Sequence, residues 1–332
     1  MGTSRETPTH TAAASKRVLV TGATGQDGRY LCEALVAQGA RVYGLFAPEQ
    51  GSLADEPKYR GVDFLSGDLR DAASLRRALD AAQPDEIYNL AAITFVPASW
   101  QDPGDIFDVN TLGVARLLTA IRDCGAPIRF CQASSAEIFG AASGLPEDEN
   151  TALRPANPYG VTKAKAHRLV ARARDEHGLF ACSAILFNHE SPLRPPHFVT
   201  RKITMAAARI ARGLDHELIL GSLDAARDWG YAPEYMGALQ LMLTAARASD
   251  YVVATGRSAT VREFVALAFS HVGLDWRDYV RSDSSLQRSS DGAARIGNAA
   301  RIARELGWKA RTSLEQLVTT MVDADLALID AR

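Results

Sequence analysis

The chain of 332 residues is long enough for one large domain, or two closely joined domains, with an ample core. Its composition, 47% hydrophobic and 23% charged, is that of an ordinary globular protein. The formal net charge of −2 argues against a surface for nucleic acid or membrane, although local basic residues remain able to hold a small anion.

Targeting, membrane and metal-binding patterns do not stand out. No apolar run reaches the roughly 20 residues of a membrane span. Residues 1–15 lack the apolar stretch of a secretory signal, so we expect a mobile tail on a cytoplasmic protein. The cysteines show no metal-ligand spacing and are expected to be free thiols without a metal: Cys32, Cys124, Cys131 and Cys182.

Short apolar strands alternate with amphipathic helices up to about residue 190. Strands are predicted at 17–21, 41–46, 62–69, 86–92, 129–140 and 180–188. Helices are predicted within the runs 29–40, 74–83, 110–125 and 158–178. Gly39 lies past the end of the first helix, and Asn110 is expected to be the N-cap of the third. The alternation predicts βαβ units and a doubly wound parallel (Rossmann) sheet.

The pattern changes after residue 190, where helical stretches at 200–212, 232–246 and 261–272 are separated by loops. This predicts a smaller, mostly helical cap. We therefore expect a dinucleotide-binding domain at 16–190 and a substrate-binding cap at 191–332 that is interwoven with it.

A glycine-rich turn follows the first strand. Gly22, Gly25 and Gly28 have the spacing GxxGxxG between a strand and a helix. Glycines let the backbone approach a diphosphate, and a helix N-terminus offers free N–H groups and the positive end of its dipole. In this position the motif predicts a dinucleotide site, although glycine turns also end many strands that bind nothing.

The choice between NAD and NADP stays open. An acid at the end of the second strand would bind the ribose of NAD, and arginines there would bind the 2′-phosphate of NADP. The strand ends in "GLFAPEQ" with neither. Glu49 either reaches back to the ribose or is a solvated loop acid. Asp68, after the third strand, either touches the adenine or acts as a turn residue.

Tyr159 and Lys163 lie four residues apart at the start of a predicted helix and share one face. A phenol with a pKa of about 10 is a poor base at neutral pH. We expect the ammonium group, together with a cationic nicotinamide, to lower that pKa. Tyr159 would then take a proton from a sugar hydroxyl that Ser135 holds. A helix-start tyrosine beside a solvated lysine would explain this spacing alone, but not its combination with Ser135 and the glycine loop.

Together these motifs resemble the extended short-chain dehydrogenase/reductase family, whose members act mostly on nucleotide sugars. The resemblance covers nearly the whole chain after the tail. It is carried by TGxxGxxG at 21–28, "NLAA" at 89–92, Ser135 and Tyr159/Lys163. Longer strings are similar to GDP-mannose 4,6-dehydratases: "TGATGQDGRYL", "QASSAEIFG", "NPYGVTKAKAH", "ILFNHESP", "FVTRKI", "LDAARDWGYAPEYM" and "VVATGRSATVREF".

By motif match, this resemblance implies three groups of site residues. The catalytic group is Ser135, Glu137, Tyr159 and Lys163. An NAD or NADP cofactor would contact Tyr159 and Lys163 and also Gly22, Thr24, Gly25, Gln26, Asp27, Gly28, Asp68, Leu69, Leu90, Ala91, Ala92, His189 and Arg194. The substrate would contact Asn188, Val199, Lys202, Arg227, Arg288 and Asp291. Fork-like arginine donors suit a diphosphate, although any single arginine could instead form a surface ion pair.

Glu137 separates a dehydratase from the other activities of the family. Two residues after Ser135 on the predicted strand, it would face the same pocket. Oxidation of carbon 4 of the hexose acidifies the proton on carbon 5, which Glu137 would remove before protonating the departing hydroxyl of carbon 6. The cofactor would return its hydride to carbon 6, so the net reaction is loss of water. A strand-end glutamate in a salt bridge is the alternative.

Several departures from the dehydratase pattern bear on specificity. "FAPEQGSL" replaces the usual Arg-Arg-Ser-Ser stretch after the second strand, which serves NADP selection and tetramer contacts in the resembled enzymes. The resemblance implies NADP, but with this replacement NAD also stays open, and so do a homodimer and a homotetramer. Ser135 stands for the usual threonine, and Ile93 and Phe95 stand for glutamine and histidine. "RSSDG" at 288–292 stands for Arg-Pro-x-Glu-Val. A hexose other than mannose, or a heptose, therefore stays open.

We expect conversion of GDP-mannose to GDP-4-keto-6-deoxymannose. The alternatives are a GDP-heptose or other nucleotide-sugar dehydratase, an epimerase, a 4-keto-6-deoxy sugar reductase and a non-catalytic dinucleotide sensor. A sensor would be expected to lose the Tyr/Lys pair or the pocket arginines, which this chain retains.

Overall fold

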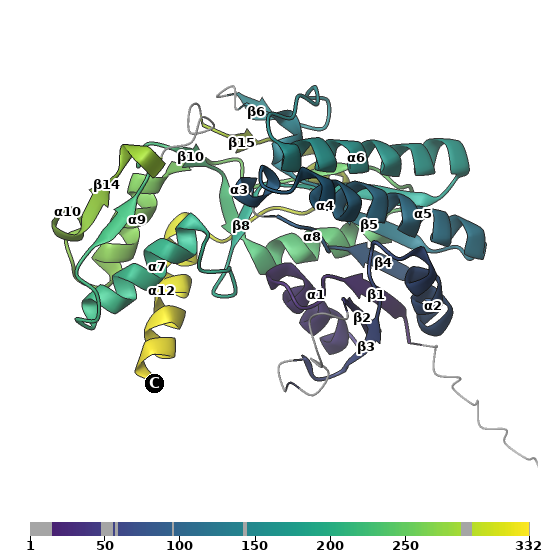
Figure 1. Cartoon of the computed structure of the whole chain (residues 1–332), viewed down its shortest axis with the longest axis horizontal. Helices are drawn as coiled ribbons and strands as arrows, with labels where there is room; N and C mark the ends of the chain where they lie inside the picture. The colour runs from purple at the N-terminus through teal and green to yellow at the C-terminus, as the bar shows by residue number, and fades with distance from the viewer. Residues whose placement is uncertain are drawn as a thin grey trace, which may run out of the picture.

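The computed structural model describes residues 15–47, 56, 59–94, 96–141, 145–286 and 294–331. At its centre lies a seven-stranded sheet in the order β12-β7-β5-β4-β1-β2-β3, in which every neighbouring pair is parallel (Figure 1). The strands are β1 (Arg17–Thr21), β2 (Arg41–Phe46), β3 (Val62–Ser66), β4 (Glu86–Asn89), β5 (Arg129–Ala133), β7 (Phe180–Leu186) and β12 (Tyr251–Val253). The doubly wound sheet predicted from the sequence is confirmed.

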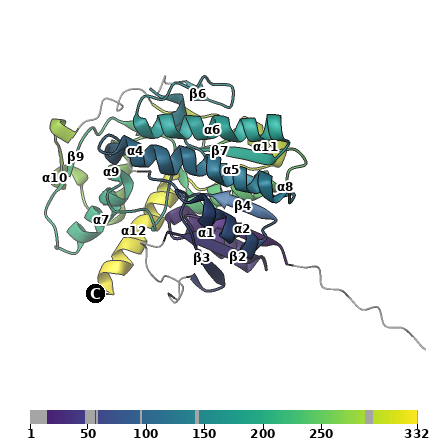
Figure 2. The same cartoon turned by 45° about the vertical axis from the view of Figure 1, so that its right-hand side comes forward.

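Alternate side chains of the buried strands face two helix layers. Val18 and Val20 of β1 pack in the cluster that contains α1 and α8, whereas Leu19 between them packs with α2, α5 and α6. Figures 1 and 2 show the sheet between these two layers. The helices are α1 (Gln26–Ala37), α8 (Ala232–Thr244) and α11 (Ala300–Leu306) on one face, and α2 (Ala72–Ala82), α5 (Gly113–Cys124) and α6 (Pro158–His177) on the other.

The strand order reverses between β1 and β4. From β1 the chain proceeds to one edge through β2 and β3, then crosses to the other side through β4, β5 and β7. At the carboxyl ends of the two central strands, Thr21 Oγ1 donates to Asn89 Oδ1 at 2.5 Å. Doubly wound sheets bind ligands at such a switch point, outside the carboxyl ends of the strands.

The helix predicted at 110–125 begins earlier than expected. Asp102 caps α4 (Pro103–Phe107) by accepting from the backbone N of Asp105 at 3.0 Å, and a π-helical segment (Asp108–Leu112) continues into α5. The prediction of Asn110 as an N-cap is therefore wrong. Its buried side-chain amide instead accepts from the backbone N of Ile93 at 2.9 Å and donates to that residue's carbonyl at 3.0 Å. Asn110 thus holds the loop that follows β4.

The chain beyond residue 190 builds a second body around its own core. Helices α7, α9 and α12 pack around Ile203, Phe264 and Val318, and two short parallel strands cover them, to the left of the sheet in Figure 1. The elements are α7 (Val199–Ala211), α9 (Val261–His271), α12 (Leu314–Asp330), β9 (Leu218–Leu220) and β14 (Val280–Ser282). The three helices predicted in this region are confirmed as α7, α8 and α9.

Two elements from this later part of the chain return to the central sheet. Helix α8 packs beside α1, and β12 forms the edge strand next to β7. Strand β12 and helices α11 and α12 were not predicted from the sequence. The remaining short elements are α3 (Val96–Ser99), β6 (Pro146–Glu147), β8 (Asn188–Glu190), β10 (Ala226–Arg227), β11 (Trp229–Tyr231), β13 (Ala259–Thr260), α10 (Trp276–Tyr279) and β15 (Ile296–Gly297). Within the described ranges, no helix combines the length and apolar character needed to cross a bilayer.

Candidate active site

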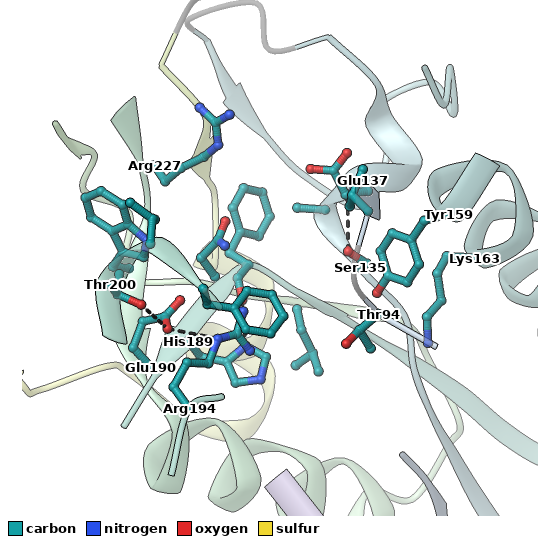
Figure 3. Close-up of a pocket in the computed structure, with 18 of the residues that line it drawn as sticks. Thr94, Ser135, Glu137, Tyr159, Lys163, His189, Glu190, Arg194, Thr200 and Arg227 are labelled. Atoms are coloured by element: carbon teal, nitrogen blue, oxygen red, sulfur yellow. Dashed lines mark hydrogen bonds and ion pairs between the residues drawn. The ribbon is translucent and has the colours of Figure 1, made fainter. Parts of the chain in front are cut away.

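A cavity of about 310 Å³ opens at the carboxyl ends of β4, β5 and β7, beside the second body (Figure 3). Most residues predicted for catalysis and binding line it. From the sheet and its loops these are Asp27, Leu90, Ala92, Ser135, Glu137, Tyr159 and Lys163. From residues 188–227 they are Asn188, His189, Arg194, Val199 and Arg227. The cavity therefore brings together both parts of the chain.

Some predicted residues lie elsewhere. Lys202 is exposed on α7, and its Nζ donates to the carbonyl of Ile219 at 2.7 Å rather than lining the cavity. Leu69 is buried in the core between the sheet and helices α2, α5 and α6, and its carbonyl accepts from Arg116 at 3.2 Å. Glu49, Phe95, Arg288 and Asp291 lie outside the described residues.

The turn after β1 fits a dinucleotide diphosphate. Gly22 has φ +66°, and a Cβ there would lie 2.7 Å from the backbone N of Ala91, so only glycine is accommodated. Gly25 is the N-cap of α1 and supplies no side chain to accept from the first turn. The backbone N–H groups at the start of α1 are thus available to an anion. Thr24 lies in this turn, and Gln26 and Gly28 lie in the first turn of α1.

Behind the turn, a polar network joins it to the segment at 187–191. Gln26 Nε2 donates to the carbonyl of His189 at 3.2 Å, and Ser191 Oγ donates to Gln26 Oε1 at 2.8 Å. The Nε2 atom of His189 lies 2.9 Å from Asp27 Oδ2, and its Nδ1 lies 2.7 Å from the carbonyl of Phe187. Because that carbonyl can only accept, Nδ1 carries a proton.

The two charged members of this network shift each other's titration. Burial opposes ionisation of both groups. His189 nevertheless lowers the pKa of Asp27 to about 2, and Asp27 raises the pKa of His189 above its ordinary 6.5. The geometry and these directions favour an imidazolium–carboxylate pair. Asp27 is thereby neutralised where the diphosphate would lie.

A second buried acid orients Arg194. The carboxylate of Glu190 accepts from Thr200 Oγ1 at 2.6 Å and lies 3.0 Å from Nε of Arg194, and its side chain is 2% exposed. The guanidinium of Arg194 stacks over the ring of Phe198 at 3.7 Å. Figure 3 shows Glu190, Thr200 and Arg194 together on one wall of the cavity. Sequence reasoning missed Glu190 and Thr200, although the string "NHESP" contains this acid.

Asp68 is engaged by its own neighbour. Its carboxylate accepts from Nε and Nη2 of Arg70 at 3.0 and 2.7 Å, and this hydrogen bonding holds the pKa of Asp68 below its usual range. Its backbone N is held by Ser74 Oγ at 3.0 Å. Asp68 therefore acts as a turn residue, which is one of the two roles expected from the sequence. The other role, a contact with adenine, stays a prediction.

Tyr159 and Lys163 enter the cavity from the first turns of α6. Asn157 caps this helix by accepting from the backbone N of Gly160 at 2.7 Å, and Pro158 occupies its first position. The Nζ atom of Lys163 donates to the carbonyl of Ala133 at 2.9 Å and lies 5.8 Å from the centroid of the Tyr159 ring. The carboxyl end of β5 thus holds the ammonium group.

Burial has the largest effect on the pKa of Tyr159. Burial raises it to about 12, although hydrogen bonding with Ser135 lowers it, and the charge of Glu137 raises it further. Burial also lowers the pKa of Lys163 to about 8. Both side chains are desolvated, and the ammonium group of Lys163 bonds to a carbonyl. The lowering expected from that ammonium group together with a cationic nicotinamide stays a prediction.

Ser135 and Glu137 face the cavity for a different reason than predicted. Strand β5 ends at Ala133, and Ser135 caps a 3₁₀ helix (Ala136–Phe139) by accepting from the backbone N of Glu137 at 3.2 Å. The extended strand predicted through residue 140 is therefore wrong. The half-buried carboxylate of Glu137 accepts from Asn157 Nδ2 at 2.7 Å. In Figure 3, the hydroxyl groups of Ser135 and Tyr159 lie near each other, and the carboxylate of Glu137 extends from the same turn away from them.

Metal-site geometry is not seen in the described parts of the chain, where no three His, Cys, Asp or Glu side chains gather suitably. The four cysteines form no disulfide, and three of them are buried. What the cavity offers is a proton-transfer set of Tyr159, Glu137 and Ser135, beside a turn shaped for a diphosphate. This arrangement suits proton transfer at a sugar next to a bound dinucleotide.

Known proteins resemble this chain over nearly its whole length. Residues 19–321 match the family described as GDP-mannose 4,6 dehydratase. The chain is 44% identical over 327 residues to GDP-mannose 4,6 dehydratase 1 of Arabidopsis thaliana, which covers 94% of this chain and 90% of that protein.

Solved structures extend the likeness to the whole fold. UDP-glucose 4-epimerase of Thermus thermophilus in complex with NAD has a TM-score of 0.82 at 28% identity, covering 93% of this chain and 98% of that one. RMD from Pseudomonas aeruginosa, complexed with NADPH, has a TM-score of 0.80 at 26% identity, with 95% and 100% covered. A family match that runs from the first strand into the last helix means that this chain belongs to the GDP-mannose 4,6-dehydratases, NAD(P)-dependent enzymes classed as lyases.

Proposed function

We propose that this protein removes water from GDP-mannose to give GDP-4-keto-6-deoxymannose. The observation that carries the proposal is a single one. The carboxylate of Glu137 lines the same cavity as Tyr159 and Ser135, and Asn157 holds it at 2.7 Å. A sugar bound there would meet a phenol for its 4-hydroxyl and a separate carboxylate for its carbon 5.

The cofactor is NAD or NADP. When bound, the nicotinamide accepts a hydride from carbon 4 and returns it to carbon 6, and its positive charge favours the phenolate of Tyr159. The glycine turn and the N-terminus of α1 would hold the diphosphate, with Arg194 and the His189–Asp27 pair beside it. Lys163 and Leu90 face the cavity from the sheet side.

The first half of the reaction needs a base for the 4-hydroxyl. Tyr159 takes this proton while Ser135 Oγ holds the same hydroxyl. Lys163, held on the carbonyl of Ala133, keeps a positive charge 5.8 Å from the phenol ring. The C4–H and O4–H bonds break, and a carbonyl forms at carbon 4.

The second half is a β-elimination followed by reduction. The new carbonyl acidifies the proton on carbon 5, and Glu137 removes it. Glu137 then gives this proton to the hydroxyl of carbon 6, which leaves as water while a C5=C6 double bond forms. Hydride would then return to carbon 6, and the proton that Tyr159 took from the 4-hydroxyl balances the one added at carbon 5. One water is lost, and the cofactor ends in its starting state.

Recognition of the nucleotide is assigned to β8 and to the second body. Arg227, Val199 and Asn188 line the cavity, and Arg227 would meet the diphosphate with a forked guanidinium. Arg288 and Asp291 are proposed to contact phosphate and ribose on the family pattern alone. Lys202 contacts Ile219 instead, so we give it the lowest rank among the substrate residues.

The test is incubation with a panel of GDP-, UDP-, dTDP- and CDP-sugars, with mass spectrometry to detect loss of water. We expect dehydration of GDP-mannose without net change in cofactor absorbance. A reductase would consume reduced cofactor stoichiometrically, and an epimerase would leave the mass unchanged. A Glu137→Gln variant should still bind the sugar nucleotide but not turn over. Unchanged turnover in that variant would refute the elimination role.

We also propose a homo-oligomer in the cytoplasm. Beside the start of α6, an apolar groove is lined by Pro103, Phe107, Pro155 and Val161, with Trp100 64% exposed at its rim. A surface of this kind suits a second copy of the chain. Light scattering at several concentrations tests it, with Trp100→Asp expected to shift the mass toward the monomer. The unpaired thiols suit a reducing compartment.

A further inference from the structure

The turn that carries Glu137 is held on two sides. On one side, Asn157 donates to its carboxylate, and Gly160 brings α6 so close that a Cβ there would lie 2.5 Å from the carbonyl of Glu137. On the other side, the backbone carbonyls of Ala136, the first residue of the 3₁₀ helix, and of Gly140, the residue after it, both accept from donors elsewhere in the chain.

Arg295 supplies those donors. It directly precedes β15, and its side chain is 6% exposed. Its Nη1 donates to the carbonyl of Ala136 and its Nη2 to that of Gly140, so one guanidinium spans the beginning of the turn and the residue after it. The planar fork of arginine suits two acceptors held in one plane, and no other side chain offers this geometry.

A carboxylate shares the buried space with Arg295. Glu147 on β6 is 5% exposed, and its Oε2 lies 3.8 Å from Nη1 of Arg295. Strands β6 and β15 pair in parallel, and the backbone N of Asn298 donates to the carbonyl of Glu147 at 2.8 Å. These two strands lie side by side at the top of Figure 1. Burial raises the pKa of Glu147 to about 7 against the pull of Arg295, and the charge of Glu137 adds to the rise.

We infer that Arg295 is a positioning residue for the elimination step, because it clamps both ends of the turn that aims Glu137 at carbon 5 of the sugar. This inference rests on the proposed function. Neither Arg295 nor Glu147 lines the cavity, so both act through Glu137 and touch no reacting atom. Tyr159 and Ser135 reach the cavity from α6 and from the end of β5, and Arg295 contacts neither hydroxyl.

Loss of the clamp should therefore separate the two halves of the reaction. Oxidation at carbon 4 depends on Tyr159 and Ser135 and continues. Removal of the carbon 5 proton depends on where Glu137 points and becomes slow. A displacement of about 1 Å at a reacting group costs on the order of 100-fold in rate.

The test compares Arg295→Met, Arg295→Lys and wild type. For each we measure kcat, KM, thermal unfolding and, in a single turnover with enzyme in excess of GDP-mannose, the absorbance of the reduced cofactor. Arg295→Met should lower kcat by about 100-fold with KM close to wild type, and reduced cofactor should persist during the turnover. Arg295→Lys keeps the positive charge but reaches only one of the two carbonyls. Its kcat should therefore lie between those of Arg295→Met and wild type. If Arg295→Met does not fold, Arg295→Lys carries the test with the same readouts.

Arg174→Met is the matched control. Arg174 makes a bidentate pair with Asp250 at 3.0 and 2.9 Å near the other end of α6, roughly 25 Å along the helix from Asn157. The Arg174→Met variant should be less stable than wild type, but reduced cofactor should not persist during its single turnover. Wild-type kcat in a folded Arg295→Met protein overturns the inference. A lower kcat without persistent reduced cofactor, matched by Arg174→Met, also overturns it. If Glu137→Gln itself turns over, the proposed function fails first, which distinguishes the two failures.

Discussion

His189 and Asp27 form a contact of 2.9 Å between segments 162 positions apart in the chain. Asp27 lies in the first turn of α1, the helix that would receive the cofactor diphosphate, and His189 lies on β8 at the cavity wall. A bare carboxylate at Asp27 would repel a diphosphate. The imidazolium of His189 neutralises it, and the pair therefore makes anion binding depend on the protonation of one histidine.

The affinity for NAD(P) should fall as the pH rises through the raised pKa of His189. Below that pKa the imidazolium compensates Asp27, and above it the carboxylate stands uncompensated. Loss of a charged hydrogen-bonding partner costs about 2 kcal/mol, so Kd should rise on the order of 10-fold or more. Calorimetric titration of cofactor at several pH values measures this. A Kd independent of pH on the alkaline side of neutrality would contradict it.

A His189→Asn variant isolates this effect from that of other titratable groups in the cavity, such as Lys163, whose pKa is about 8. The variant should bind cofactor weakly at all pH values and should lose the part of the slope that His189 causes. The matched control is His271→Asn, because His271 pairs with Asp323 at 2.6 Å on the surface between α9 and α12. That variant should keep the wild-type slope.

Asn157 has two separable roles, which two substitutions distinguish. Its oxygen caps α6, and its Nδ2 donates to Glu137. Asn157→Asp keeps the cap, since aspartate and asparagine cap helices equally well, but places a second carboxylate against Glu137. We expect a melting temperature near wild type and a kcat lower by about 10-fold or more. Asn157→Ala should also lose about 1 kcal/mol of stability. Wild-type turnover in Asn157→Asp would show that the donated bond is unimportant.

Much of the fold was predictable because buried parallel strands appear as apolar runs with glycine at their ends. The runs at β1, β2 and β7 gave these strands closely. Strand β12 has only three residues and cannot be distinguished from a loop without its neighbour β7. Asn110 fits an N-cap locally, but Pro103 and Asp102 start the helix earlier and a π segment carries it through. At this position, tertiary packing overrode the local preference of asparagine for an N-cap.

The candidate site, like the fold, was predictable only in part. Short motifs predicted Ser135, Glu137, Tyr159 and Lys163, and the structure brings these four to one cavity. Groups that orient them were not predictable, because they depend on contacts between distant segments. Asn157 meets Glu137 across 20 positions, and Arg295 meets the carbonyl of Ala136 across 159. Alternation along a strand gave the right side for Glu137 but for the wrong reason.

Tyr159 should stay protonated in the absence of cofactor up to strongly alkaline pH. Its burial raises the pKa to about 12, so an ultraviolet difference titration of wild type against Tyr159→Phe should show no tyrosinate from this residue below about pH 10. With GDP-mannose and cofactor, Tyr159→Phe should lower kcat by roughly 100- to 10,000-fold. No reduced cofactor should appear in a single turnover, in contrast to Arg295→Met. Appearance of reduced cofactor in Tyr159→Phe would remove this residue from the first step.

Glu147 should make the protein less stable as the pH rises. Its pKa is about 7 in the folded protein, against an ordinary value of 4.5. Below the lower value both folded and unfolded chains hold the proton. Between the two values only the folded chain holds it, so stability falls with rising pH and the loss is complete above about 7. The difference corresponds to about 3 kcal/mol of unfolding free energy.

Urea unfolding of wild type and Glu147→Gln at several pH values measures this loss. Glutamine cannot ionise, so the variant should lose less unfolding free energy than wild type between about pH 5 and about pH 8. Glu86→Gln is the control, because Glu86 is equally buried but lies 2.8 Å from Lys16, and its removal leaves Glu147 in place. Identical pH slopes in wild type and Glu147→Gln would mean that the carboxylate behind the Glu137 turn is ionised throughout, as a full partner of Arg295.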